Sequence, residues 1–372
     1  MSTNLHFSHS FLLKIALLAV LFVSCKSQNK QSITEQTTIA ALENRIPKLI
    51  RSDLFDTSSV NVIQLETTDE SLIGSVAKLI KTDNKIFILD ASGAKRLLVF
   101  DSKGRFQNSL GLSGRGPGEL INILDFCVDT GEEAVVLTCS TGRIVKIDYH
   151  GKVIEERSFA ALTNIISYNG NYYGYTGAHA ISDDFENHQI VKLNNDLEIE
   201  QLYLPFSHPF PGLFRNINAL YKHNEEVYFF SLLDNAIYQL QNDHFSMRYY
   251  FDFGSRQLCL KEASSPDLIF GNDYSFLWNY SVVGDSIIFM SVFDNGRPYI
   301  AILNKEAKTL FLVDSMDDNL PEISNPVSHS NGMFISVITS HRFLETFPSS
   351  DISPSPDDNP LLLEYRIKNI FE

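Results

Sequence analysis

Cysteine is scarce in this chain, and its few copies are not arranged for redox chemistry. Four cysteines occur among 372 residues, and no CxxC pair is present. Cys25 lies just after the N-terminal apolar run and stands apart from the other three cysteines, whose odd number excludes a complete disulfide framework. Cys127 and Cys139 fall on neighbouring predicted strands and could pair in an oxidising compartment. We favour the interpretation that Cys127, Cys139 and Cys259 are small buried apolar groups.

The sequence motifs of common catalytic and metal sites are also absent. There is no HExxH, GxSxG or P-loop pattern and no zinc-spaced set of Cys and His. We therefore predict no catalytic residue, no metal ligand and no cofactor. Carboxylates are plentiful, and catalytic groups can come from distant parts of a chain, so a glycosidase pair is left open as an alternative.

Positive charge is in short supply. Lys and Arg number 30 against 45 Asp and Glu, which gives a formal net charge of −15 at pH 7. So acidic a chain repels nucleic acid and anionic membrane surfaces. We therefore expect no nucleic-acid partner.

Long helical and long apolar stretches are lacking beyond the N-terminus. Between residues 60 and 372 a helical period almost never persists for three turns. The one long apolar run, residues 11–23, is interrupted by Lys14. It has the length of a signal-peptide core and is too short for a membrane-spanning helix.

The end of this apolar run predicts a lipid anchor. Residues 21–25, LFVSC, resemble the lipobox of bacterial lipoproteins, and the chain turns polar directly afterwards. The resemblance implies cleavage after residue 24 and acylation of Cys25, and several acyl chains hold a protein stably on a membrane. We expect a signal peptide over residues 1–24 and an acylated cysteine with a flexible polar tether over residues 25–57. The alternative is an ordinary secretory signal with an incidental cysteine.

A repeat fills the rest of the chain. Each copy opens with a strand, a tight polar turn and a second strand, and each closes with an apolar strand that ends in Asp, Asn or Gln. The closing residue recurs at Asp101, Asp148, Asn194, Gln241 and Asn304, at spacings of 47, 46, 47 and 63. Four-stranded units of this length are typical of the blades of a β-propeller.

Counting the copies predicts six blades. Five full copies precede a sixth, from residue 325 to 367, that is short of one strand, while residues 60–65 (VNVIQL) form an extra strand before the first copy. We expect this strand to complete the last blade and remove the last open sheet edge. The sequence therefore predicts an all-β fold over residues 58–372, a six-bladed β-propeller of four-stranded antiparallel blades closed by an N-terminal strand.

Three short segments carry a resemblance to a known family. They are FDSKG at 100–104, GRGPGE at 114–119 and NPLLL at 359–363. With the lipobox, they make the chain resemble the six-bladed β-propeller lipoproteins of Bacteroidota, which are similar to NHL-repeat propellers. The resemblance implies an outer-membrane lipoprotein of the cell envelope. Surface-exposed lipoproteins of that phylum often carry an acidic run after the cysteine, and residues 26–30 (KSQNK) have none, which favours the periplasmic face.

Candidate ligand-binding residues are expected at the mouth of the propeller. Arg115 and Glu119 lie at a blade junction, Trp278 and Tyr280 could line the channel, and Arg342 ends a strand of the sixth unit. For each we favour a structural role: an ion pair between blades, aromatic packing and an exposed surface position. The acidic loop at residues 183–188 (DDFENH) offers oxygen ligands for Ca²⁺, but it lacks EF-hand spacing, and we favour a solvated loop.

Three hypotheses for function follow. The favoured one is a membrane-anchored, non-catalytic propeller that binds an envelope protein or glycan. The second is a propeller lyase or hydrolase that acts on a glycan or lactone, with or without Ca²⁺, and the third is a structural envelope component. An enzyme predicts a deep central pocket with converging carboxylates, histidines or a metal. A binding module predicts a flat or plugged face with exposed aromatic side chains.

Overall fold

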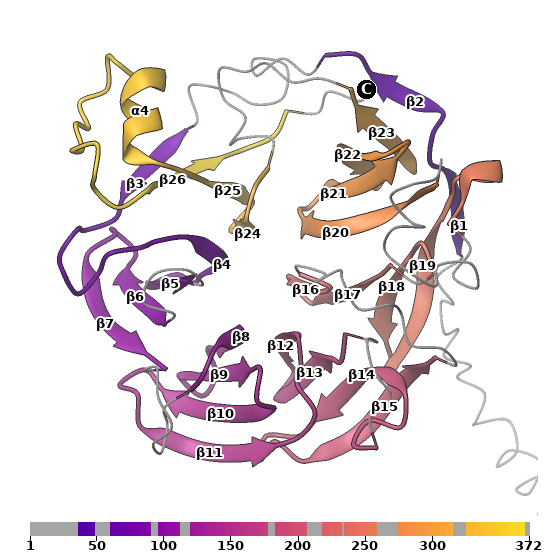
Figure 1. Cartoon of the computed structure of the whole chain (residues 1–372), viewed down its shortest axis with the longest axis horizontal. Helices are drawn as coiled ribbons and strands as arrows, with labels where there is room; N and C mark the ends of the chain where they lie inside the picture. The colour runs from indigo at the N-terminus through magenta and orange to yellow at the C-terminus, as the bar shows by residue number, and fades with distance from the viewer. Residues whose placement is uncertain are drawn as a thin grey trace, which may run out of the picture. The chain divides into compact units, whose positions relative to one another are not determined.

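Six β-sheets stand in a ring in the computed structural model (Figure 1). The structure describes residues 36–48, 60–90, 96–111, 120–177, 183–206, 218–232, 234–258, 274–314 and 325–368. The first strand of each sheet contacts the first strand of the next sheet along the chain, and that of the sixth contacts that of the first. The predicted six-bladed propeller is confirmed.

Blades one to three have four antiparallel strands each, in chain order from the centre of the ring outward. Blade one holds β4 (Val76–Lys81), β5 (Lys85–Asp90), β6 (Leu97–Asp101) and β7 (Phe106–Leu110). Blade two holds β8 (Ile123–Asp129), β9 (Ala134–Cys139), β10 (Arg143–Asp148) and β11 (Val153–Ser158). Blade three holds β12 (Asn164–Tyr168), β13 (Asn171–Tyr175), β14 (His188–Leu193) and β15 (Ile199–Pro205).

Blades four to six each include N-terminal residues. Blade four holds β16 (Leu220–His223), β17 (Glu226–Ser231), β18 (Ala236–Gln241), β19 (His244–Asp252) and an added β1 (Thr37–Ala40). Blade five holds β20 (Ser275–Val283), β21 (Ile287–Asp294), β22 (Arg297–Asn304), β23 (Thr309–Val313) and an added β2 (Asn44–Ile46). Blade six holds β24 (Ser328–Ser330), β25 (Met333–Ile338), β26 (Leu361–Tyr365) and β3 (Asn61–Gln64).

The hydrophobic core is divided among the interfaces between blades. Within the described residues, six clusters of buried side chains form, one between each pair of neighbouring blades. Every residue of β9 and of β21 is buried. Because both faces of each sheet pack against a neighbour, these strands appear in the sequence as continuous apolar runs and do not alternate with polar residues.

The turn that closes each repeat explains why Asp or Asn recurs there. Asp101, Asp148 and Asn194 each accept two backbone N–H bonds, at 2.9–3.0 Å, from residues two and four positions later. A short side-chain acceptor thus organises the hairpin between the third and fourth strands. Gln241 differs, because blade four uses a two-residue turn in which Asn242 and Asp243 have φ of 49° and 59°.

The N-terminal strand closes the ring as predicted. β3 pairs antiparallel with β26, with Ile63 opposite Leu362, and becomes the outermost strand of blade six. The side chains of Ile63 and Leu65 are buried in the cluster between blades six and one. Closure therefore joins the two ends of the propeller through hydrogen bonds and an apolar interface together.

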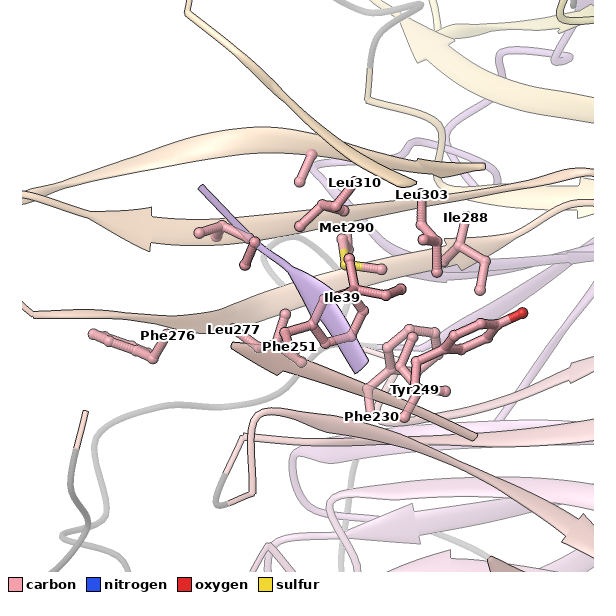
Figure 2. Packing of buried hydrophobic residues seen from close by; sticks show 14 of the residues in the cluster. Ile39, Phe230, Tyr249, Phe251, Phe276, Leu277, Ile288, Met290, Leu303 and Leu310 are labelled. Atoms are coloured by element: carbon pink, nitrogen blue, oxygen red, sulfur yellow. The ribbon is translucent and has the colours of Figure 1, made fainter. Parts of the chain in front are cut away.

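Two further N-terminal strands differ from the expected tether. β1 pairs parallel with β19, and β2 pairs parallel with β23, so each adds a fifth strand to the outer edge of a blade. Ile39 of β1 is buried among side chains of blades four and five (Figure 2). Residues 37–46 are thus part of the folded propeller, although they lie within the range 25–57 for which a flexible tether was predicted.

Helical structure is minor in the described residues. α4 (Ser340–Thr346) lies between β25 and β26, and the hydroxyl of its N-cap Thr339 accepts a hydrogen bond from the Arg342 amide. η2 (Gly254–Arg256) is a single 3-10 turn. Among these residues no helix has the length and apolar character needed to cross a membrane.

Cys127 and Cys139 do not pair. Both thiols are free and buried, and they lie on opposite faces of blade two, with Cys127 packed towards blade three and Cys139 towards blade one. Burial raises the pKa of the Cys127 thiol. The interpretation as small buried groups is confirmed for these two residues, and Cys259 lies outside the described part of the chain.

Candidate ligand-binding cavity

A cavity of about 410 Å³ lies at the centre of the ring. The innermost strands β4, β8, β12, β16 and β24 all contribute residues, and the turns after β4, β8, β16 and β24 add Thr82, Asp83, Thr130, Asn224 and Asn331. Its polar lining comprises Lys78, Lys81, Thr82, Asp83, Thr130, Ser167, Asn218, Lys222, His223, Asn224, Ser328, His329, Ser330 and Asn331. The cavity therefore lies at the end of the ring where the first and second strands of each blade are joined.

Two lysines of β4 line the cavity while their carboxylate partners lie behind the wall. Lys78 Nζ is 2.9 Å from Asp125 Oδ2, and Lys81 Nζ is 2.8 Å from Glu364 Oε1. Neither carboxylate lines the cavity, and both side chains are 6% exposed. The ammonium groups are therefore held in fixed positions at the cavity wall, since each buried charge has its partner.

Side-chain hydrogen bonds join the innermost strands of blades one to four. Asp125 Oδ2 on β8 accepts from Lys78 Nζ, from Asn164 Nδ2 at 2.5 Å and from the Ile165 amide at 2.7 Å. The Oδ1 atom of Asn164 accepts from the Leu220 amide at 2.6 Å. One carboxylate and one amide thus connect four successive blades.

The remaining three junctions are bridged in the same way, which completes a polar belt around the channel. The bridging contacts are Asn218 with Ser281 in both directions, Tyr280 Oη to the Pro326 carbonyl, and Ser330 Oγ to the Lys81 carbonyl. Because each junction carries at least one such bond, the cavity wall is rigid and already organised for a ligand.

Two histidines face each other at the cavity. The rings of His223 on β16 and His329 on β24 are 4.8 Å apart at an interplanar angle of 64°. His223 Nε2 is 2.9 Å from Asp285 Oδ1, and the His329 ring also contacts Phe334. The His329 amide donates to the Tyr221 hydroxyl at 3.0 Å. Both rings are therefore held in place by contacts from blades four, five and six.

Both imidazoles are uncharged at neutral pH. Burial, assisted by the nearby His223, lowers the pKa of His329 to about 4. Burial and the ammonium of Lys305 also lower the pKa of His223, although the hydrogen bond to Asp285 opposes this. That bond keeps the pKa of Asp285 below its usual value in spite of partial burial. The cavity thus offers neutral ring nitrogens that donate or accept hydrogen bonds.

The sequence-predicted site residues that the structure describes do not line this cavity. Trp278 packs against the rings of Phe276 and Phe293, with ring centroids 5.8 and 5.4 Å away. Tyr280 belongs to the polar belt, and Arg342 lies on α4 with its guanidinium 3.3 Å from Glu345 Oε2. The structure therefore places these three residues in packing, in the belt and on a surface helix.

The remaining predicted features either lie outside the described residues or, in the case of the acidic loop, do not form a metal site within them. Cys25, Arg115 and Glu119 fall outside the described ranges. In the acidic loop, Asp184 Oδ2 accepts from the Ala160 amide at 2.7 Å, and Phe185 is buried. Across the described ranges, no group of three or more His, Cys, Asp or Glu side chains is placed to hold a metal ion.

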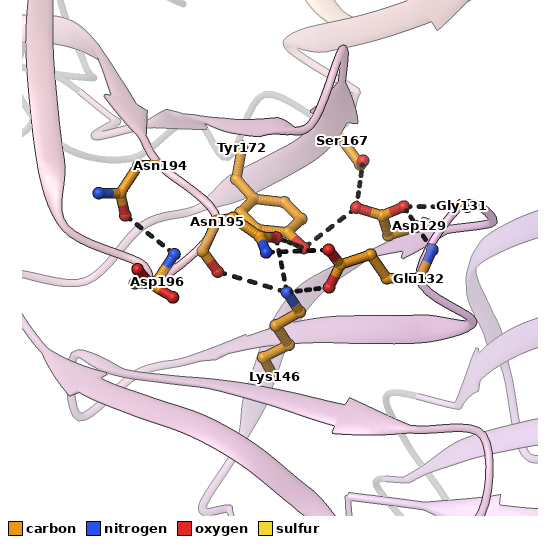
Figure 3. Close-up of polar contacts among 9 residues, drawn as sticks. All are labelled: Asp129, Gly131, Glu132, Lys146, Ser167, Tyr172, Asn194, Asn195 and Asp196. Carbon is orange, nitrogen blue, oxygen red and sulfur yellow. Dashed lines mark hydrogen bonds and ion pairs between the residues drawn. The ribbon is translucent and has the colours of Figure 1, made fainter.

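A second polar cluster connects blades two and three (Figure 3). Lys146 Nζ is 2.7 Å from Glu132 Oε2 and 2.7 Å from Asn195 Oδ1, and it lies over the Tyr172 ring. The Tyr172 hydroxyl donates to Asp129 Oδ2 at 3.1 Å. This buried ammonium is fully partnered from within the chain, so the cluster is structural.

The cavity residues had a signal in the sequence that could have revealed them. Lys78 and Lys81 interrupt the apolar strand VAKLIK, Asp125 interrupts ILDFCVD, and two polar residues end the short strand LYKH. A polar residue in an otherwise buried strand needs a partner or contact with the channel, so it marks the channel wall or the contacts behind that wall. None of the site residues predicted from the sequence lies in these three strands.

Comparisons with known proteins identify a family and a solved structure of similar fold. The model of a family described as "Domain of unknown function (DUF4934)" matches residues 37–366. A solved structure from Bacteroides fragilis, of a protein whose name describes it as exported, has a TM-score of 0.69 at 17% identity, covering 90% of this chain and 99% of that one. BamB from Moraxella catarrhalis follows with a TM-score of 0.41 at 11% identity, covering 75% and 72%. No curated protein matched.

Proposed function

Because the chain belongs to the DUF4934 family and shares its propeller fold with an exported protein, we propose that it is a cell-envelope lipoprotein that binds a glycan in the central cavity without transforming it. The lipid anchor would be Cys25, and the propeller would face the periplasm. An envelope location agrees with the exported relative of similar fold. The lipobox-like sequence supports the anchor.

The observation that carries the binding proposal is the preorganised polar wall. Hydroxyl, amide, imidazole and ammonium groups from five blades meet in a cavity of about 410 Å³, a volume that suits a ligand of one or a few sugar units. Sugars are recognised by many hydrogen bonds to groups that do not need to move. The belt around the channel supplies that rigidity, since it fixes the strands that carry these groups.

The proposal is tested by blocking the cavity from its rim. Thr130 lines the cavity, whereas Thr141 is an exposed residue in the turn between β9 and β10 of the same blade. We expect residues 26–372 to bind at least one envelope oligosaccharide in calorimetry, Thr130→Trp to weaken binding about tenfold or more, and Thr141→Trp to leave it unchanged. Equal binding by both variants, or no binding by the unmodified protein, would contradict the proposal.

A second candidate function, catalysis, is favoured by one observation. The hydrogen bond between His223 and Asp285 beside a second histidine resembles the arrangement of a general base with an orienting carboxylate, and it lies in a central pocket. The lowered pKa of both histidines argues for binding, because a weak base gains little driving force for proton transfer near neutral pH. Chromatography of each bound oligosaccharide after long incubation separates the two: shortened or unsaturated products would establish the enzyme.

The anchor is tested separately from the ligand. We expect cells that express the full chain to incorporate a radioactive or clickable palmitate analogue into it, and the Cys25→Ser variant to lose the label. Label retained in Cys25→Ser would show that lipid is attached elsewhere. A protein without label that is released in soluble form from the envelope would identify an ordinary secretory signal.

A further inference from the structure

The cavity lining is rich in basic residues, although the chain as a whole is acidic. The chain carries a net charge of −15, yet the cavity lining includes three lysines, two histidines and a single acidic residue, Asp83. Lys78 and Lys81 line the cavity, whereas Asp125 and Glu364, the carboxylates that neutralise them, do not. This distribution of charge favours a negatively charged group inside the cavity.

Lys222 is the cation best placed to contact a ligand. It lies on β16, its side chain is exposed, and it projects over the ring of Tyr168 at 5.9 Å. Within the described part of the chain, no salt bridge joins Lys222 to a carboxylate, whereas Lys78 and Lys81 each have one. Its charge is therefore available to a ligand without leaving a buried carboxylate unpaired.

We propose that the ligand is an acidic sugar whose carboxylate lies beside Lys222, with its hydroxyls on the serine and asparagine groups of the wall. This inference rests on the proposed glycan-binding function and specifies its substrate class. Charge-assisted hydrogen bonds from ammonium groups recognise a carboxylate. Because Asp125, Glu364 and Asp83 equal the three lysines in number, and of these lysines only Lys222 lacks a carboxylate partner within the described residues, the site suits a single carboxylate better than a doubly charged phosphate.

The neutral histidines fit this arrangement. His329 and His223 carry no charge at pH 7, so they do not bind a second anion but offer ring nitrogens to sugar hydroxyls. Ser328 and Ser330 precede and follow His329 in β24 and also line the cavity, and Ser330 Oγ donates to the Lys81 carbonyl at 3.1 Å. Groups that can bind sugar hydroxyls therefore line the same cavity as Lys222.

The test compares one acid with its neutral derivative. Calorimetry is run on residues 26–372 with galacturonate, with its methyl ester and with a sugar phosphate of similar size, at low and physiological salt. We expect galacturonate to bind about tenfold more tightly than the ester, because a charge-assisted hydrogen bond is lost on esterification. The preference should shrink at higher salt.

A matched pair of variants assigns the preference to the cavity. Lys222→Gln should lose most of the preference for the acid and keep the affinity for the ester, whereas Lys152→Gln, which makes the same charge change at an exposed residue outside the cavity lining, should keep both. Since Lys222 is exposed and forms none of the belt contacts, the variant should fold, which circular dichroism checks.

Each other outcome overturns a different statement. Equal binding of acid and ester would overturn the acidic class and leave the glycan-binding function standing. Tighter binding of the sugar phosphate would replace the carboxylate by a phosphate. Failure of the folded protein to bind these ligands or any neutral oligosaccharide would overturn both proposals.

Discussion

Two glycines at equivalent places in the repeat differ in what surrounds them. Gly104 and Gly151 each follow the closing aspartate of their blade by three residues and have φ of +86° and +85°. A Cβ on Gly104 would lie 2.2 Å from the Gln64 carbonyl oxygen of β3, whereas the nearest atom to a Cβ on Gly151 is a leucine methyl at 3.6 Å. Gly104 is therefore required both by backbone conformation and by the closing strand.

Alanine at the two glycines should separate these effects. We expect Gly151→Ala to cost about 1 kcal/mol of unfolding free energy from the positive φ alone. Gly104→Ala should cost about 2 kcal/mol more, because the backbone of β3 must also shift. Urea denaturation of both variants measures the difference. Equal losses would show that the closing strand moves aside freely.

The histidine pair makes stability depend on pH. The folded-state pKa of His329 is about 4, below that of an unfolded histidine near 6.5. Between these values the unfolded chain takes up a proton that the folded protein resists, so stability falls as pH falls from 6.5 towards 4. We expect His329 alone to account for about 3 kcal/mol of this loss.

His329→Gln should flatten the fall in stability over that pH range, as measured by denaturant titrations at each pH. The charged groups that surround His329 come from two blades: His223 of β16 in blade four, and Asp285 and Lys305 in the turns after β20 and β22 of blade five. Asp285 favours the protonated ring and the other two oppose it. His244→Gln, at an exposed residue, is the control, and an unchanged pH profile in His329→Gln would contradict the assignment.

At the scale of the element, β1 and β2 form a strap along the outer edges of blades four and five. Each pairs parallel with an outermost strand, and together they leave those edges covered. Ile39 inserts into the same cluster as Tyr249, Phe251 and Met290 (Figure 2). The strap therefore contributes apolar burial as well as hydrogen bonds.

Replacing Ile39 by alanine tests whether the strap stabilises the propeller. We expect Ile39→Ala to cost about 2–4 kcal/mol, the usual result of removing a fully buried aliphatic side chain. Ile199→Ala, at a residue that is 37% exposed, should change stability little. Thermal unfolding of both variants gives the comparison, and a silent Ile39→Ala would show that the strap detaches without cost.

The elements could be predicted where the chain repeats and not where it departs from the repeat. The blades were predictable because the closing turns at Asp101, Asp148 and Asn194 use one hydrogen-bond pattern, and because β3 lacked a partner within its own unit. β1 and β2 were missed because each is four residues or fewer, and their partners are more than two hundred residues away. Polar sequence around a short strand carries no local sign of such pairing.

The ligand cavity was less predictable for a related reason. Its wall gathers side chains from five blades, and nothing in linear spacing relates Lys81 to His329 or Lys222. Trp278, the single tryptophan, was a candidate for the channel lining, but it packs in the interface of blades four and five. Composition draws attention to rare residues such as Trp278, but the arrangement of the blades determines which side chains lie close together.

At the scale of the whole molecule, the closed ring couples distant interfaces. β3 completes blade six and packs against blade one, while Trp278 lies in the interface between blades four and five. Each interface buries apolar side chains of two neighbouring blades. If one interface opens, those side chains are exposed to water and the ring is no longer closed. We expect the propeller to unfold as one unit.

A charge placed at the closure tests this cooperativity. Ile63→Asp should lower the unfolding free energy by about 2 kcal/mol or more, because it buries an unpaired carboxylate between blades six and one. Trp278 fluorescence and circular dichroism should shift to the same lower denaturant midpoint. Ile154→Asp, at a residue 48% exposed, should shift neither. An unmoved fluorescence midpoint in Ile63→Asp would show that the blades melt independently.

The order of the three N-terminal strands has a mechanical consequence. Along the chain, β1 comes first, β2 second and β3 last, and only β3 closes the ring. A pulling load applied to the N-terminal side of β1 therefore reaches the closing strand only after two other strands have been peeled from their blades. β1 and β2 therefore protect the closing contact between β3 and β26 from a load that is applied at the N-terminal end of the chain.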